Sequence, residues 1–205
     1  MTQPDDPLKA ARQRALMACS RHHYKTARRL LLPLAEQGDV SAQMTLFEIH
    51  YLGDGGHVDK SRAAYWFEQV VTQAENGCGE AQWALYQHYL ADGDIAAREF
   101  AVPWDSEIST QWLMAAANSG YAEAMFELSM KYRTGCEGKD GRRLIEVDLT
   151  SSDFWLDRAV AEQYPDALVF KSFFYFENGQ PTDKAKVLLK AAADLGSLEA
   201  TEYLT

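Results

Sequence analysis

Apolar residues recur along the chain at a spacing that predicts short helices. In four segments an alanine is followed, four and eight residues later, by side chains on the same helical stripe, and at the eleventh residue by Gly, Asp or Asn, which end helices. Each segment therefore predicts a helix of about three turns. These segments begin at Ala42, Ala81, Ala124 and Ala167, and a fifth, partial copy begins at Ala200.

A second set of helices is predicted between these segments. Each carries a pair of large residues and, one turn later, a pair of small or aliphatic residues, a pattern that favours close helix packing. A glycine-centred turn follows, except in the fourth copy, where Gln163-Tyr164-Pro165 places a proline that can open the next helix. We expect the tryptophans of the large pairs, Trp66, Trp112 and Trp155, to be buried and structural.

These motifs resemble the Sel-one-like repeat, a relative of the tetratricopeptide repeat. The segment from Ala63 to Val71 is similar to the second helix of that repeat, and the segment from Tyr51 to Asp59 is similar to its inter-helix loop. The resemblance covers residues 27–205 and implies an all-α fold, a right-handed α/α solenoid of antiparallel helix pairs with about five repeats. The sequence departs from the family pattern where larger or polar residues replace a glycine five residues after the alanine, at Phe47, Tyr86, Ser129 and Ser172.

The alanines are spaced unevenly, which predicts insertions between repeats. Two insertions are expected in loops, at residues 93–105 and 135–150, and a third lengthens the helix that follows Trp66. We expect one domain over residues 1–205, with a leading helix within residues 1–26, near Pro7 to Ser20. Insertions of this kind cluster on one edge of a solenoid and often bind a partner.

The charge of the chain limits its partners. The net charge is −10, which argues against nucleic acid, because binding to phosphates depends on Lys and Arg. Residues 1–40 carry +3 and the remainder carries −13, so a basic protein partner is favoured. Three separated cysteines in no metal-binding pattern, no long apolar run and no basic leader predict a cytoplasmic protein that does not cross a membrane.

No known catalytic or cofactor-binding spacing is found in the sequence, so we expect no enzyme activity, cofactor or metal. The segment Cys19-Ser20-Arg21-His22-His23 is a weak metal candidate, more typical of ordinary surface residues because no second ligand cluster accompanies it. His50 occupies a repeat position that tyrosine fills elsewhere, which favours a packed histidine over a base. Asp54, His57 and Asp59 share a loop that is acidic in the family.

The helices that begin at the repeat alanines also carry large apolar side chains on the side opposite the alanine stripe. In this superfamily that side of the first helix of each repeat faces the concave groove. Such residues, mixed with isolated polar ones, are typical of a protein interface, although coverage by C-terminal helices would explain them equally for the apolar run of residues 167–176. We expect Asp92 and Asp94 to steer the partner electrostatically. The predicted partner-binding residues are Met44, Glu48, Tyr51, Trp83, Gln87, Leu90, Phe126, Met130, Arg133, Phe173 and Phe176, and Val169 shares their helical phase.

Two classes of function remain open from the sequence. The first is a non-enzymatic protein-binding module, an adaptor or a bacterial immunity protein that neutralises a cognate toxin with a basic surface. The second is a small-ligand sensor or an enzyme with its pocket in the groove, which would need converging polar groups that the sequence does not display at a recognisable spacing.

Overall fold

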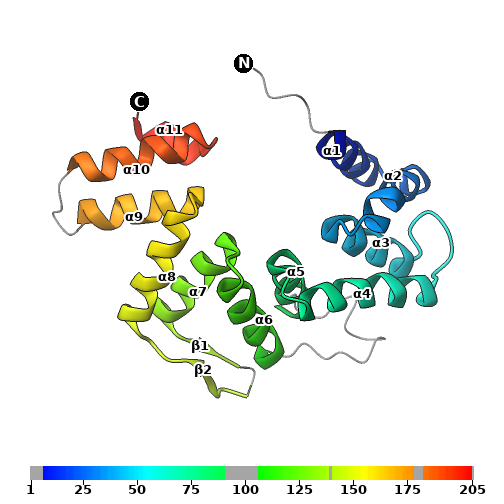
Figure 1. Cartoon of the computed structure of the whole chain (residues 1–205), viewed down its shortest axis with the longest axis horizontal. Helices are drawn as coiled ribbons and strands as arrows, with labels where there is room; N and C mark the ends of the chain where they lie inside the picture. The colour runs from blue at the N-terminus through cyan, green and yellow to red at the C-terminus, as the bar shows by residue number, and fades with distance from the viewer. Residues whose placement is uncertain (1–6, 91–105, 139, 178–181, 205) are drawn as a thin grey trace. The chain divides into compact units, whose positions relative to one another are not determined.

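The computed structural model describes residues 7–90, 106–138, 140–177 and 182–204. It divides into two compact units, Met1–Asp105 and Ser106–Thr205, called here the N-terminal and the C-terminal unit (Figure 1). The described part of the N-terminal unit contains five helices: α1 (Pro7–Ser20), α2 (Tyr24–Glu36), α3 (Val40–Leu52), α4 (Lys60–Glu75) and α5 (Gly79–Leu90). The C-terminal unit contains α6 (Ser106–Asn118), α7 (Ala122–Thr134), β1 (Cys136–Glu137), β2 (Arg143–Ile145), α8 (Leu149–Ala161), α9 (Pro165–Glu177), α10 (Thr182–Asp194) and α11 (Leu198–Leu204).

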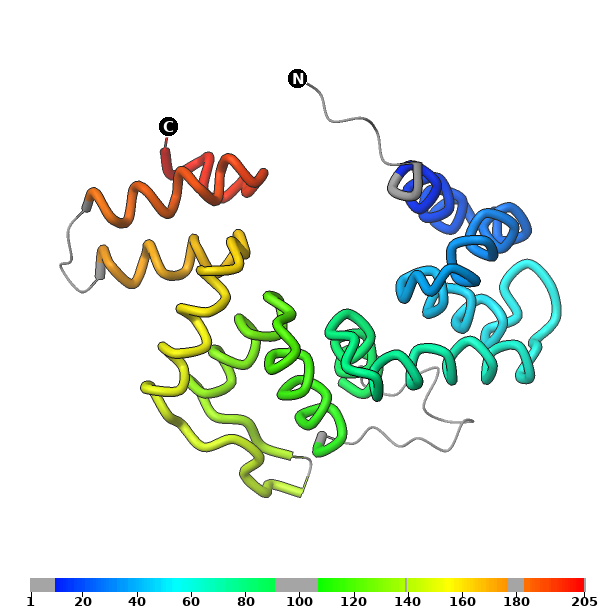
Figure 2. The backbone as a smooth tube through the Cα atoms, viewed as in Figure 1, coloured from blue at the N-terminus to red at the C-terminus, as the bar shows by residue number. Residues whose placement is uncertain are grey.

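Within each unit, helices that follow one another in the chain pack together, as in an α/α solenoid (Figure 2). The helix pairs are α1 with α2, α3 with α4, α7 with α8, and α9 with α10. None of the described helices has both the length and the apolar composition needed to span a membrane. The leading helix, predicted near Pro7 to Ser20, is present as α1 and packs against α2 as the first helix of a pair.

The alanine register of the sequence is confirmed by burial. Ala42, Ala81, Ala124, Ala167 and Ala200 all have 0% exposure. Each alanine lies on the first helix of a repeat, where the lack of a longer side chain lets the neighbouring helix approach. The four residues that replace the family glycine are also buried, and the hydroxyls of Ser129 and Ser172 donate to the backbone carbonyls of Phe126 and Val169.

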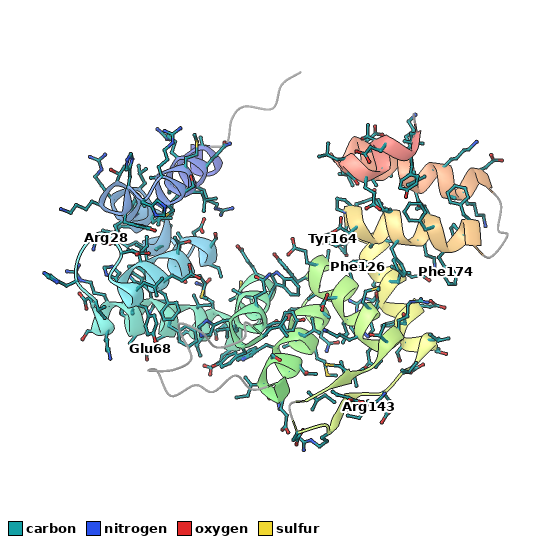
Figure 3. All side chains as sticks on the ribbon, turned by 180° about the vertical axis from the view of Figure 1, so that it is seen from behind. Arg28, Glu68, Phe126, Arg143, Tyr164 and Phe174 are labelled. Carbon is teal, nitrogen blue, oxygen red and sulfur yellow. The ribbon has the colours of Figure 1, made fainter. Side chains whose placement is uncertain are left out.

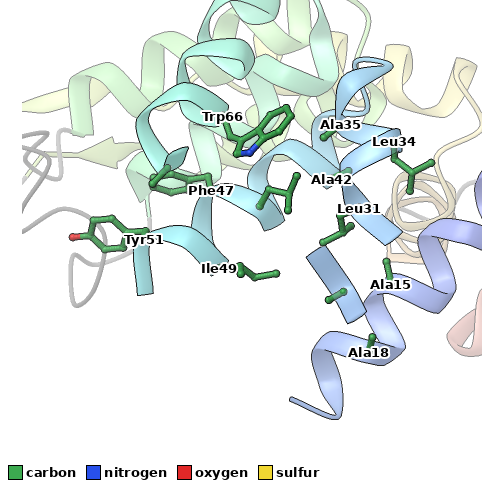
Figure 4. Close-up of a cluster of buried hydrophobic side chains, with 13 residues drawn as sticks. Ala15, Ala18, Leu31, Leu34, Ala35, Ala42, Phe47, Ile49, Tyr51 and Trp66 are labelled. Carbon is green, nitrogen blue, oxygen red and sulfur yellow. The ribbon is translucent and has the colours of Figure 1, made fainter. Parts of the chain in front are cut away.

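Tryptophans from the second helices contribute to the same cores. Trp66 of α4 is buried with Phe47 and Leu31 in the core of the N-terminal unit (Figure 4). Trp155 of α8 is also buried, whereas Trp112 of α6 is only half-buried. The prediction of burial is therefore confirmed for two of these residues and is too strong for Trp112.

The turns between repeats share one hydrogen-bonding pattern. After α6, Gly120 takes a positive φ of 93°, and the amide of Tyr121 donates to the carbonyl of Ala116. After α8, Gln163 takes a positive φ of 58°, and the amide of Tyr164 donates to the carbonyl of Ala159 in the same way. Gln163 therefore adopts a left-handed conformation that glycine tolerates better, which explains how the fourth turn keeps its shape without glycine.

The insertion at residues 135–150 forms a small antiparallel hairpin instead of the expected loop. β1 pairs with β2, and Arg143 forms an ion pair with Glu137 at 2.7 Å. Arg142 forms an ion pair with Glu107, which links the hairpin to α6. The third predicted insertion is confirmed as the long helix α4, whereas residues 93–105, Asp92 and Asp94 lie outside the described residues.

Candidate protein-binding surface

The predicted groove residues lie on α3 and α5 in the N-terminal unit and on α7 and α9 in the C-terminal unit. Their side chains fall into three environments: core, packed but partly exposed, and open surface. Each unit presents its own part of the predicted surface, and the two parts are described separately.

Tyr51 of α3 is a core residue, not an exposed anchor. Its side chain is 7% exposed, and its ring stacks on Phe47 with centroids 5.7 Å apart (Figure 4). The helical phase of Tyr51 indicated the groove, but neighbouring residues cover its ring, so the expectation of an exposed contact is corrected. Met44, from the same helix, is half-buried against this core.

The other predicted residues of the N-terminal unit are more accessible. Trp83 is half-buried, with its ring centroid 5.0 Å from that of Tyr86. Gln87 and Leu90 are exposed on the same helix, and Leu90 retains 43% of its accessible surface. Glu48 of α3 is exposed, and partial desolvation, followed by the nearby Asp54, raises the pKa of its carboxyl.

In the C-terminal unit, Phe126 of α7 belongs to an aromatic group shared with α9. Its ring centroid lies 5.7 Å from Tyr164 and 5.9 Å from Phe170, and Figure 3 shows Phe126 beside Tyr164. Phe126 and Met130 are both half-buried. Both side chains therefore keep part of their surface accessible, and their role in binding a partner stays a prediction.

Arg133 is held inside the C-terminal unit by its neighbours. Its guanidinium forms an ion pair with Asp153 of α8 at 3.0 Å and lies 5.4 and 5.5 Å from the ring centroids of Phe170 and Phe174. The carboxylate on α8 and the two aromatic rings on α9 compensate much of the positive charge of this guanidinium. Arg133 therefore joins α7, α8 and α9, and its predicted role as an open groove contact is corrected to a packing role.

The residues predicted on α9 differ among themselves. Val169 is buried, and Phe173 is half-buried with its ring centroid 4.6 Å from Tyr203 of α11. A C-terminal helix, α11, therefore covers part of Phe173, which is the alternative that the sequence left open for this residue. Phe176 is exposed, with 40% of its surface accessible.

Two tyrosines that sequence reasoning did not select complete this surface. Tyr121 directly precedes α7, and Tyr164 directly precedes α9 and donates its hydroxyl to Asp166 at 3.1 Å. Burial first, and then Asp166, Glu123 and Tyr121, raise the pKa of the Tyr164 phenol well above its ordinary value. The residues Tyr121, Glu123, Phe126, Tyr164 and Asp166 are called here the tyrosine–carboxylate surface. The signal in the sequence was that both tyrosines stand three residues before a repeat alanine.

Solved structures similar to this chain share its fold. No protein-family model matches the sequence, and no curated protein matches it. A Sel1 repeat protein from Oxalobacter formigenes is 26% identical with a TM-score of 0.61, and the match covers 96% of this chain and 54% of that protein. The chain therefore has the helical-repeat fold of a Sel1 repeat protein.

Two further structures show the same fold at lower identity. One is c5321, a protective antigen present in uropathogenic Escherichia coli strains that displays an SLR fold, with 24% identity, a TM-score of 0.57, and coverage of 86% of this chain and 35% of that one. The other is PA5086 of Pseudomonas aeruginosa, with 16% identity, a TM-score of 0.57, and coverage of 97% and 70%. The chain therefore spans about half the length of the Oxalobacter protein and about a third of c5321.

The Cys, His and Asp residues of the candidate polar segments do not form a common site in the described part of the chain. Within the described ranges, no three His, Cys, Asp or Glu side chains are placed together to hold a metal ion. Burial, then Glu48 and Asp54, raise the pKa of the Cys19 thiol, which favours its unreactive protonated form. His50 is buried, and desolvation, then Arg28 and Arg62, lower its pKa, in agreement with the predicted packed histidine.

Proposed function

We propose that this Sel1-like repeat protein is a non-enzymatic protein-interaction module whose partner presents a basic surface. The observation that carries the proposal is the half-exposed aromatic group around Phe126 on the first helices of the C-terminal unit, bordered by Glu123 and Asp166. Large aromatic side chains that can be desolvated are the usual anchors of protein interfaces. Phe126 contacts Tyr164 and Phe170 of the next repeat, and the part of its ring that stays accessible is available to a partner.

Charge supports a basic partner. Residues 106–205 contain sixteen Asp and Glu against ten Lys and Arg, which gives this unit a net charge of −6. A field of this sign accelerates association with a basic protein and disfavours acidic competitors. Two roles fit such a partner. The chain is either an immunity protein that binds a basic toxin or an adaptor that binds another basic protein.

Partner capture with a matched control variant tests this proposal. The tagged full chain, Phe126→Ser and Val187→Ser would each be incubated with lysate of the source organism; Val187 is exposed on α10 and lies outside the proposed surface. We expect one stoichiometric basic protein to be retained by the wild type and by Val187→Ser, and lost with Phe126→Ser. Loss with both variants, or retention with both, would contradict the proposed surface.

Two follow-up measurements separate the roles that share this binding activity. If the captured protein arrests growth when expressed alone and the arrest is relieved by this chain, the immunity role is supported; harmless expression supports the adaptor role. The alternative of a ligand sensor or enzyme predicts instead that a metabolite raises the melting temperature and that no protein is retained stoichiometrically.

A further inference from the structure

We propose that the tyrosine–carboxylate surface is a subsite for an arginine side chain of the protein partner. Tyr121, Phe126 and Tyr164 supply aromatic rings to the guanidinium, and Glu123 and Asp166 supply negative charge. The inference rests on the proposed function and specifies which partner group this part of the surface binds.

The two tyrosines occupy equivalent positions at the start of the first helix of a repeat. The carbonyl of Tyr121 accepts the first helical hydrogen bond of α7 from Met125, at 3.0 Å, and the carbonyl of Tyr164 accepts that of α9 from Leu168, at 3.1 Å. The residues in the same position of the other repeats are Asp39, Cys78 and Ser197, whose carbonyls accept from Gln43, Gln82 and Thr201. All five are therefore helix N-cap residues.

Tyrosine is a poor choice for this position on stability grounds. Asp39 caps α3 by accepting from the amide of Ala42 at 2.8 Å, and Ser197 accepts from the amide of Ala200 at 3.2 Å. Tyr121 makes no capping hydrogen bond with its side chain. Asp, Ser, Thr and Asn stabilise helices at the N-cap because their short side chains reach the free amides, which a phenol ring does not do. Two successive repeats thus give up a stabilising cap and place an aromatic ring there instead, as is common where function competes with local stability.

The rings and carboxylates lie within reach of one incoming group. The ring centroids of Phe126 and Tyr164 lie 5.7 Å apart with their planes tilted by 48°, so the two rings are not stacked face to face. Tyr121, Glu123, Phe126 and Tyr164 are all half-buried, and Asp166 is exposed. The hydroxyl of Tyr164 donates to a carboxylate oxygen of Asp166 at 3.1 Å. Burial and then the charges of Asp166 and Glu123 raise the pKa of this phenol, which is consistent with an acidic environment.

A guanidinium matches this combination better than other groups. It stacks on aromatic faces and donates to carboxylates at the same time, whereas an apolar group would leave the carboxylates desolvated. The chain uses the same mode internally, because Arg133 lies over Phe170 and Phe174, and Arg158 lies 4.9 Å from the ring centroid of Trp155. The partner's arginine would make the same kind of contact with aromatic rings at the N-terminal ends of α7 and α9.

The test uses a matched pair of peptides on the full chain. The probe is acetyl-Gly-Arg-Gly-Arg-Gly-amide, and its control replaces both arginines with citrulline, which keeps the shape and removes the charge. Tyrosine ring signals would be followed by NMR during titration. We expect the arginine peptide to shift the signals of Tyr121 and Tyr164 and the citrulline peptide to leave them unchanged.

Variants separate binding from folding. Tyr121→Ser removes one ring but supplies a capping side chain, so its melting temperature should stay near that of the wild type while the arginine peptide binds about threefold more weakly. Glu123→Gln with Asp166→Asn should weaken binding further. Tyr65→Ser and Asp183→Asn remove an exposed tyrosine and an exposed first-turn aspartate elsewhere, and should change nothing.

Equal binding of the citrulline peptide, or equal losses in the Tyr65 and Asp183 variants, would overturn the arginine subsite. The same variants in partner capture distinguish its failure from that of the proposed function. If the captured partner binds wild type and the Tyr121→Ser, Tyr164→Ser double variant equally, the subsite is wrong and the interaction module stands. If the arginine peptide binds selectively but no protein is captured, the chemistry of the subsite stands and the proposed function fails.

Discussion

The ammonium of Lys171 on α9 lies 2.9 Å from a carboxylate oxygen of Asp157 on α8. Lys171 is 9% exposed and occupies the repeat position at which Leu46, Leu85 and Leu128 are buried in the preceding repeats. Its ammonium also lies 5.6 Å from the ring centroids of Phe174 and Tyr175. In this repeat a lysine therefore replaces the buried leucine, and the carboxylate of Asp157 neutralises its charge.

Replacing the lysine tests whether this charge contributes to stability. Lys171→Leu restores the repeat consensus and should leave the free energy of unfolding unchanged or raise it by about 1 kcal/mol, because the cost of burying the ammonium is removed. Asp157→Ala leaves that ammonium without its carboxylate and should lower the free energy by about 1 kcal/mol, a modest value since Asp157 itself is largely exposed. Urea denaturation of both variants provides the measurement. A Lys171→Leu variant less stable than Asp157→Ala would show that the ion pair is a net stabiliser.

The turn residues Gly120 and Gln163 form a natural pair for testing backbone strain. Both have positive φ, and a Cβ added at Gly120 would meet no atom within 4 Å. Gly120→Ala should therefore lower the free energy of unfolding by about 1 kcal/mol, because alanine is strained in a left-handed backbone conformation. Gln163→Gly should raise it by about 0.5 kcal/mol, because glycine relieves this strain but adds conformational entropy to the unfolded chain. Opposite shifts of the melting temperature would confirm the equivalence of the two turns, and shifts of the same sign would contradict it.

Ala124 tests the packing of the repeat core. The residue is fully buried on α7, so Ala124→Leu should overpack the contact with neighbouring helices and cost about 1–3 kcal/mol. Ala161→Leu, on the exposed last residue of α8, serves as the control and should be nearly neutral. An unchanged melting curve for Ala124→Leu would refute the assigned register.

His88 predicts a pH dependence of stability in the N-terminal unit. Its ring lies 5.4 Å from Phe47 and 4.9 Å from Phe67, and burial lowers its pKa from the ordinary value of 6.5. The unfolded chain then binds a proton more readily than the folded chain, so stability is complete above pH 6.5 and declines as the pH falls below it. His50, whose pKa is also lowered, adds to the same trend.

The measurement for this prediction is the melting temperature between pH 7.5 and pH 5. We expect a smaller decline in His88→Phe, which retains the aromatic packing without a titrating group. The double variant His22→Asn, His23→Asn changes two exposed histidines and should follow the wild type. A decline of equal size in His88→Phe would assign the effect to other groups.

The sequence alone determined the repeat architecture of this protein. The positions of Ala42, Ala81, Ala124, Ala167 and Ala200, and the residues that end each helix, predicted where helices begin, end and meet. These features are local: helical period, small side chains and turn residues act within a few positions of one another, and their repetition reinforces each assignment.

Only the tertiary structure decided which side chains remain accessible. Helical phase assigned Tyr51, Arg133 and Phe126 to the same face, yet Phe47 stacks on Tyr51, Asp153 and two phenylalanines hold Arg133, and Phe126 stays half-exposed. Phase describes the direction of a side chain from its own helix. Burial and pairing depend on residues from other helices, far away in sequence, and their arrangement is set when the helices pack together.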